Sequence, residues 1–219
     1  MAIIRKNYMK RLRYMNNQQI ILLAMLVGLF NSLSGCSMAK LSVRASLPLM
    51  QGSLAAMNQE TDLDLAKTAM PANLMMVEGL IETEPDDVQL RLYAAQGLYS
   101  YAYGFIEDDD PKRASALYRR GLRHAQRALQ LKGLNTDILH ARRDDLERAV
   151  TKLDKDAVPA LFWSASCLAK WIYMNRDDPE IIALLGQANV LMNRVLQLDE
   201  NYYFGGAHAY FGAYYGSLA

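Results

Sequence analysis

The sequence predicts an all-α protein in which helices follow one another along nearly the whole chain. Apolar residues recur at the spacing of a helix face, and the alternating pattern of strands is absent. Acidic residues and proline punctuate the apolar segments, at 84–87, 108–111 and 177–179. Proline is tolerated in the first turn of a helix and acids complement the helix dipole there, so these groups mark helix starts.

The helices are expected in a simple order along the chain. Their predicted ranges are 38–58, 64–83, 87–106, 111–132, 137–153, 156–175, 179–198 and a last one from about 203. Pro71 falls near the front of the second helix and would bend it. The helix at 137–153 is rich in charged residues, which indicates an exposed face.

Three of these helices share a small–large–small pattern at spacings of four and three residues. The triplets are Ala72/Met76/Gly79, Ala114/Tyr118/Gly121 and Ala188/Met192/Val195. The pattern is typical of the second helix of a tetratricopeptide repeat, where small residues admit the bulky residues of the neighbouring helix. The spacing between triplets is irregular. We therefore predict a tetratricopeptide-like solenoid with degenerate repeats, in which 137–153 is an insertion.

The start of the chain resembles a bacterial lipoprotein signal peptide. Five basic residues precede an apolar run at 20–30, and Leu33, Ser34 and Gly35 lead directly to Cys36 as in a lipobox. The run is too short for a membrane-spanning helix. We expect residues 1–35 to be removed and Cys36 to carry acyl chains at the membrane. Ser37 after the cysteine favours sorting to the outer membrane.

Two other interpretations of this segment are a single-pass anchor and a buried N-terminal helix with a chance cysteine. Translation could also begin at Met9, because Lys10, Arg11 and Arg13 would still supply the positive charge. The predicted organisation is thus a signal peptide over 1–35 and one helical domain over 36–219.

The composition after the signal peptide argues against nucleic-acid binding. The chain has 24 basic and 23 acidic residues, and residues 1–35 contain five of the basic ones and no acid, which leaves a formal charge of −4. Such a domain has no basic footprint for nucleic acid. Only Cys167 remains beside Cys36, so we expect no internal disulfide.

No residues are predicted to be catalytic or to bind a metal or cofactor. His124, His140 and His208 lie far apart without carboxylates or cysteines at ligand spacing, and we interpret them as surface or packing residues. Cys167 lies in an apolar helix and is expected to be a buried small hydrophobe. No phosphate loop or nucleophile elbow is present, so we do not expect an enzyme.

Two aromatic pairs are the candidate binding residues. Tyr99 and Tyr103 are four residues apart and Trp163 and Trp171 are eight apart, so each pair falls on one helix face. These rings either belong to the solenoid core or line a surface for an apolar ligand or a protein partner.

Several stretches together resemble one lipoprotein family. They are residues 69–74, 78–83, 94–97, 101–107, 116–121, 157–163 and 202–208, of which 157–163 (Ala-Val-Pro-Ala-Leu-Phe-Trp) is the most specific. The family is the T component of tripartite ATP-independent periplasmic (TRAP) transporters. The resemblance implies a periplasmic tetratricopeptide-like lipoprotein that self-associates and docks the transporter's substrate-binding protein, around a channel for an apolar ligand.

The family continues beyond the position where this sequence stops, so the resemblance implies an incomplete repeat at the C-terminal end. The predicted function is a lipid-anchored scaffold that docks the substrate-binding protein and assists uptake of a small ligand. The alternative is a repeat adaptor lipoprotein for cell-envelope assembly.

Overall fold

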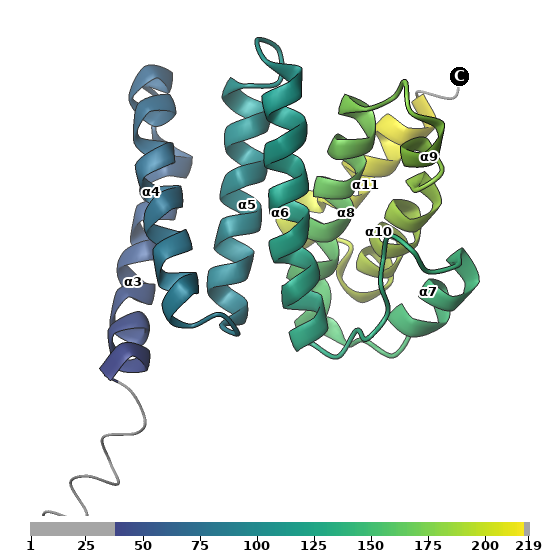
Figure 1. Cartoon of the computed structure of the whole chain (residues 1–219), viewed down its shortest axis with the longest axis horizontal. Helices are drawn as coiled ribbons and strands as arrows, with labels where there is room; N and C mark the ends of the chain where they lie inside the picture. The colour runs from purple at the N-terminus through teal and green to yellow at the C-terminus, as the bar shows by residue number, and fades with distance from the viewer. Residues whose placement is uncertain (1–37, 217–219) are drawn as a thin grey trace, which may run out of the picture. The chain divides into compact units, whose positions relative to one another are not determined.

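The structure is a computed structural model that describes residues 38–216 (Figure 1). The chain divides into two compact units, Met1–Gln51 and Gly52–Ala219. The first described helix, α3 (Met38–Gln59), crosses this division and contains Pro48. The predicted signal peptide, with Leu33, Ser34, Gly35 and Cys36, lies outside the described residues. No strand occurs between residues 38 and 216, which confirms the all-α prediction for this part of the chain.

The second unit is a series of helices joined by short connections. In chain order they are α4 (Leu63–Thr83), α5 (Val88–Phe105), α6 (Pro111–Leu131), α7 (Arg143–Val150), the 3-10 turn η1 (Lys155–Ala157), α8 (Val158–Met174), α9 (Pro179–Ile182), α10 (Leu185–Asp199) and α11 (Tyr202–Gly216). α4 runs antiparallel to α5, and α5 to α6, as the turns at alternating ends in Figure 1 show.

Aspartate side chains begin these helices, as the punctuation predicted. The Asp87 carboxylate accepts a hydrogen bond from the backbone N–H of Leu90 at the start of α5. Asp110 and Asp178 cap α6 and α9 in the same way, each followed by proline at the first helical position. These carboxylates satisfy N–H groups that have no partner within the helix, which stabilises each start.

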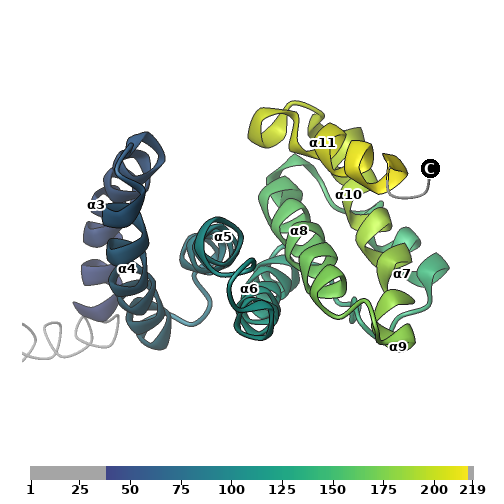
Figure 2. The ribbon, with the colours of Figure 1, turned by 90° about the horizontal axis from the view of Figure 1, so that it is seen from above.

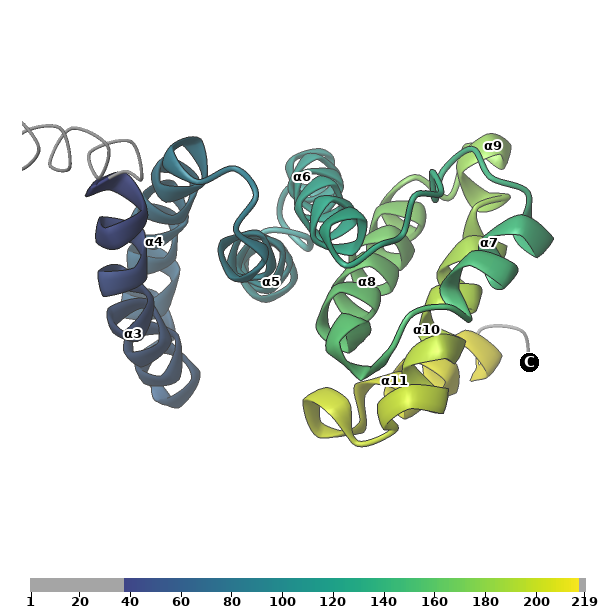
Figure 3. The ribbon, with the colours of Figure 1, turned by 90° about the horizontal axis from the view of Figure 1, so that it is seen from below.

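α8 is the centre of the second unit and lies between α6 and α10 (Figures 2 and 3). Every residue from Leu161 to Leu168 is buried, which is the pattern of a helix surrounded by others. α5, α6 and α8 meet at Gly121. A Cβ atom there would lie 3.0 Å from the Cys167 Sγ and 3.3 Å from the Ala95 carbonyl oxygen, so glycine permits this packing.

The three repeat triplets differ in how deeply their residues are buried. Ala114, Tyr118 and Gly121 are buried in α6, and the α10 triplet of Ala188, Met192 and Val195 is fully buried. The α4 triplet of Ala72, Met76 and Gly79 is instead exposed. Two of the three triplets therefore occupy packing positions, whereas the pattern in α4 carries no core contact.

The structure corrects three predicted elements. The helix expected at 137–153 is shorter, because 137–142 form turns and α7 covers only Arg143–Val150. The helix expected at 179–198 is interrupted at Ala183 and Leu184, between α9 and α10. The last helix begins with left-handed backbone, with φ of 49° at Tyr203, 60° at Phe204 and 71° at Gly205.

Among residues 38–216, the segment Pro179–Asp199 has the length and hydropathy of a membrane span. It contains the break between α9 and α10, and α10 packs against α8. A core helix of a soluble protein passes the same test, so this segment is weak support for a membrane span.

Candidate functional site

Three of the four predicted aromatic residues meet in space. The Tyr99 and Tyr103 rings stack on α5 with centroids 6.0 Å apart and an angle of 14° between their planes. Tyr99 also contacts Trp163 of α8 at 5.5 Å and Tyr118 of α6 at 5.5 Å. Trp171 contacts α6 instead, where the Arg119 guanidinium lies 4.3 Å from the centre of its ring.

The exposure of these rings differs sharply. Tyr103 is 58% exposed, whereas Trp163 and Trp171 are 2% and 7% exposed. Tyr99 lies between these extremes, and burial raises its pKa. Tyr103 is thus the predicted residue that a partner can reach directly, and Tyr99 and Trp163 form the support behind it.

The row of rings continues to the start of α11. Tyr203 lies 4.9 Å from Trp163 and 5.3 Å from Phe162, measured between ring centres. A glycine at 206 is required there, because a Cβ atom would lie 2.6 Å from the Phe162 ring. We call Tyr103, Tyr99, Trp163 and Tyr203 the aromatic row. The left-handed turn beside it leaves the Phe204 side chain fully exposed.

A partly buried ion pair lies beside the exposed end of the aromatic row. The Lys170 ammonium is 2.7 Å from a Glu107 carboxylate oxygen, and the other oxygen accepts a hydrogen bond from the Tyr118 hydroxyl at 2.5 Å. Burial, and then this hydrogen bond, raise the pKa of Tyr118, so it stays a donor. The Lys170 ammonium also lies 4.4 Å from the centre of the Tyr103 ring, a cation–π contact that fixes the ring.

Two further residues extend this surface, Tyr173 near the end of α8 and Arg176 in the turn that follows it. Tyr173 is 54% exposed, and both the Lys170 ammonium and the Arg176 guanidinium lie over its ring, at 5.4 and 5.2 Å. We call Tyr103, Lys170, Tyr173 and Arg176 the aromatic–cation surface. Sequence reasoning missed Lys170, Tyr173 and Arg176, although the three-residue spacing of Lys170 and Tyr173 on α8 would have grouped those two.

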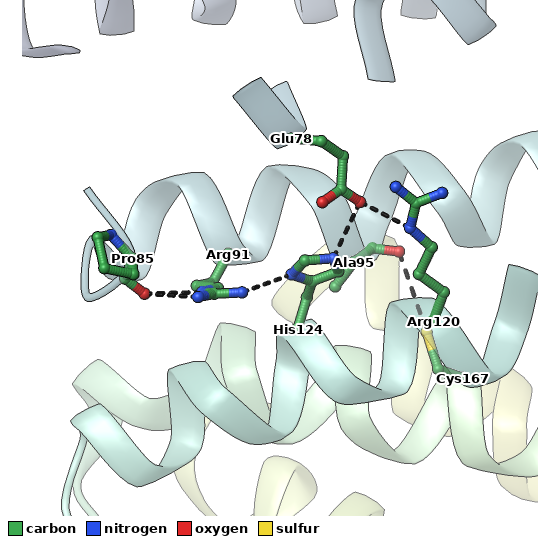
Figure 4. A network of polar contacts seen from close by, with 7 residues as sticks. All are labelled: Glu78, Pro85, Arg91, Ala95, Arg120, His124 and Cys167. Atoms are coloured by element: carbon green, nitrogen blue, oxygen red, sulfur yellow. Dashed lines mark hydrogen bonds and ion pairs between the residues drawn. The ribbon is translucent and has the colours of Figure 1, made fainter. Parts of the chain in front are cut away.

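A second polar cluster joins α4, α5 and α6 (Figure 4). The His124 Nε2 lies 3.0 Å from a Glu78 carboxylate oxygen, and its Nδ1 lies 3.1 Å from an Arg91 amino nitrogen. The same Glu78 oxygen forms an ion pair with Arg120, whose Nε lies 2.9 Å away. Arg91 also donates from Nε and Nη2 to the Pro85 carbonyl oxygen, at 2.9 and 2.7 Å.

These contacts define the state of His124. Because arginine only donates, Nδ1 accepts from Arg91 and the single ring proton lies on Nε2, facing Glu78. Burial lowers the pKa of His124, an effect that Glu78 opposes and Arg91 and Arg120 reinforce. We expected this histidine at the surface or in packing, and it lies in packing; its partners come from other helices and were not predicted.

Cys167 and the remaining histidines occupy ordinary positions. Cys167 is completely buried and burial raises the pKa of its thiol, as the small-hydrophobe interpretation predicted. His140 is exposed beside Asp137, and His208 is exposed beside Glu200. Within residues 38–216, no three His, Cys, Asp or Glu side chains gather as a metal site would require.

The fold and its surfaces thus define an all-α scaffold with an exposed aromatic and cationic surface. The model of the TRAP transporter T-component family matches residues 59–219, well over half of the sequence. The chain belongs to this family and is therefore a component associated with a TRAP transporter at a bacterial membrane. A comparison with curated proteins gives no match.

Proposed function

We propose that this chain is a lipid-anchored periplasmic scaffold that docks the substrate-binding protein of its TRAP transporter through the aromatic–cation surface. The observation that supports this most is the exposure of Tyr103 on a fixed support. Its ring is held by Tyr99 on one side and Lys170 on another, so little freedom is lost on binding. Tyrosine and arginine are enriched among the residues that dominate interface energies.

The chemistry of the surface indicates what the partner presents. Tyr103 and Tyr173 offer large apolar ring faces, and Arg176 places an exposed cation beside them, whereas the charge of Lys170 is balanced by Glu107. We expect the facing patch of the substrate-binding protein to combine apolar side chains with carboxylates. The buried packing of the α6 and α10 triplets supports a tetratricopeptide-like arrangement of the helices that carry this surface.

The anchor belongs to the same proposal. Acyl chains on Cys36 would hold the scaffold at the membrane, and Ser37 favours the outer membrane. A Cys36→Ala variant should then lose incorporation of labelled palmitate and leave the membrane fraction. Retention of both properties would contradict the lipid anchor and favour a spanning helix.

The docking test compares variants of the tagged, lipidated protein in detergent-solubilised envelopes. Tyr103→Ala combined with Tyr173→Ala should reduce recovery of the substrate-binding protein about tenfold or more, since central aromatic residues each contribute about 1–2 kcal/mol or more to an interface. Tyr215→Ala is the matched control, because Tyr215 is 64% exposed on α11 and lines a pocket with residues of α7 and α10 instead.

The outcomes separate the functional alternatives. Loss of the substrate-binding protein in the double variant, with unchanged recovery in the control, supports docking. Equal recovery from both variants would contradict the role of the aromatic–cation surface. Recovery of envelope-assembly proteins in place of the substrate-binding protein would favour the adaptor function.

The apolar ligand and self-association remain part of the proposal. The ligand would contact Tyr99 and Tyr203, which supply apolar faces with polar tips, and the buried Trp163 ring would lie behind them. Tyr99→Ala should then lower the affinity for an apolar fluorescent probe. If Tyr99→Ala abolishes folding by circular dichroism, the inner ring serves the core instead.

A further inference from the structure

A pocket of about 530 Å³ opens where α4, the α4–α5 turn, α5 and α6 meet, next to the cluster of Figure 4. Its lining is unusually rich in arginine. The residues are Glu78, Ile81, Glu82, Pro85, Arg91, Arg120, Arg123 and His124. The pocket lies on other residues than the aromatic–cation surface, so it has no part in the docking proposed above.

Two arginines of this pocket carry N–H donors that have no hydrogen-bond partner among residues 38–216. A guanidinium carries five N–H donors. Arg120 pairs with Glu78 through Nε, and its two terminal amino groups have no hydrogen-bond partner among residues 38–216. The Arg123 side chain has no hydrogen bond or ion pair within the same part of the chain. Two guanidinium groups therefore offer unpaired donors to one pocket.

The framework around the Arg120 donors is fixed in advance, whereas no hydrogen bond or ion pair within the described residues holds the exposed Arg123 side chain. Glu78 holds Arg120 by the Nε ion pair at 2.9 Å, and it holds His124 at 3.0 Å. Arg91 is held between His124 and the Pro85 carbonyl oxygen. Side chains that are already ordered lose little entropy when a ligand arrives, which favours binding at this position.

The charges of the lining select the ligand. Three arginines stand against the carboxylates of Glu78 and Glu82, and His124 is neutral, so the lining has a formal surplus of one positive charge. Glu82 is exposed and has no ion pair within the described residues. A group with one negative charge balances the surplus, whereas a doubly charged phosphate would be repelled by Glu82.

We propose that this pocket binds a carboxylate through the terminal amino groups of Arg120 and the guanidinium of Arg123. A carboxylate is planar and accepts paired hydrogen bonds from a guanidinium, which matches the unpaired donors. The carboxylate comes from a small organic acid or from a glutamate side chain on a protein surface. The chemistry of the site is the same for both sources.

The test follows the arginine Nε–Hε signals of the full-length, lipidated protein in detergent by ¹⁵N NMR. The probes are propionate against propionamide, and the capped tripeptide Gly-Glu-Gly against Gly-Gln-Gly. Ionic strength is held constant with chloride, because salt screens exposed charges. Propionate should shift the Arg120 and Arg123 signals at concentrations where propionamide does not. If only the glutamate peptide does so, the source is a protein side chain.

Single substitutions show whether each charged side chain strengthens or weakens binding of the carboxylate probe. Arg120→Gln and Arg123→Gln should each weaken binding of the active probe about tenfold, since each removes hydrogen bonds to a charged group. Glu82→Gln should strengthen it by about two- to fivefold, because a competing surface charge is removed. Arg142→Gln is the control, since Arg142 is exposed and its side chain has no ion pair in the described part of the chain.

If Arg120→Gln disturbs the packing of α4, the affinity of the Glu82→Gln variant still tests the proposal, because this substitution should strengthen binding and does not remove a hydrogen bond or ion pair of α4 within the described residues. Equal shifts with the acid and amide probes would overturn the proposal. So would affinities for the Arg120→Gln and Arg123→Gln variants within twofold of the Arg142→Gln control. Failure of docking at Tyr103 would leave the carboxylate site unaffected, because the two tests share no residue.

Discussion

The α6–α8 region and the junction of α4 with α6, both in the second unit, differ in the interactions that stabilise them: apolar packing in the first and ionic contacts in the second. α8 buries every residue from Leu161 to Leu168 and contacts its neighbours through aliphatic and aromatic side chains. In α4 only Ala66, Val77 and Ile81 are buried, and the half-buried Met70 and Leu74 pack against the core. Its Glu78 pairs with His124 and Arg120 of α6, a set of polar contacts that we call the α4 joint. Because ionic contacts depend on salt and pH and apolar packing does not, we expect the α4 joint to respond to both more strongly than the packing around Leu161–Leu168 does.

The largest expected effect tests the apolar side of this contrast. Trp163→Ala should lower the free energy of unfolding by about 3–5 kcal/mol, because it removes a buried ring and leaves a cavity. The lost contacts include Tyr99, Phe162 and Tyr203. Urea unfolding followed by far-ultraviolet circular dichroism measures the change. A loss below about 1 kcal/mol would mean that Trp163 is not part of the main core.

Removal of Glu78 tests the polar side. Glu78→Ala leaves the His124 Nε2 donor and the Arg120 guanidinium without their carboxylate, which should cost about 1–3 kcal/mol. The effect should be local. We expect backbone amides of α4 to exchange hydrogen faster, while those of α8 keep their protection. Equal acceleration in both helices would show that the α4 joint and the α8 core unfold as one unit.

The sequence predicts most of the apolar helices of the core, but little of the polar cluster that joins α4 to α6. Helical periodicity locates α5, α6 and α8 within a few residues, and acidic residues and proline mark the starts of α5 and α6, because these signals are local. The cluster around His124 joins residues up to 46 positions apart, from Glu78 to His124. No local pattern encodes that meeting.

The same reasoning explains the individual errors. The charge-rich segment at 137–142 keeps helical periodicity but forms turns, since the Asp137 carboxylate accepts hydrogen bonds from the Leu139 backbone N–H and the His140 ring. The left-handed turn at Tyr203 and Phe204 could not be predicted either, because non-glycine residues seldom adopt positive φ. Tyr99 and Tyr103 were correctly placed on one helix face, whereas the Lys170 contact required the tertiary fold.

Acid should weaken the α4 joint selectively. The pKa of His124 is lowered in the folded protein from its ordinary value of 6.5, so the unfolded chain binds the proton more readily. Stability from this residue is then complete above about pH 6.5 and falls as the pH drops toward the folded pKa, by at most about 1.4 kcal/mol per pH unit. The difference in unfolding free energy between wild type and His124→Gln, measured from pH 8 to pH 5, should show this slope. The corresponding difference for the exposed His208→Gln is the control; an equal slope would assign the effect elsewhere.

The smallest effect concerns an ion pair at the same joint that is open to water. Arg127 pairs with Asp86 of the α4–α5 turn, and the two side chains are 40% and 65% exposed. Solvent screens such a pair, so Asp86→Asn should change the free energy of unfolding by less than about 1 kcal/mol. The change should also disappear at 1 M sodium chloride, where the screening length is only about 3 Å. A loss as large as that of Glu78→Ala would show that the number of ion pairs, and not their burial, holds α4 in place.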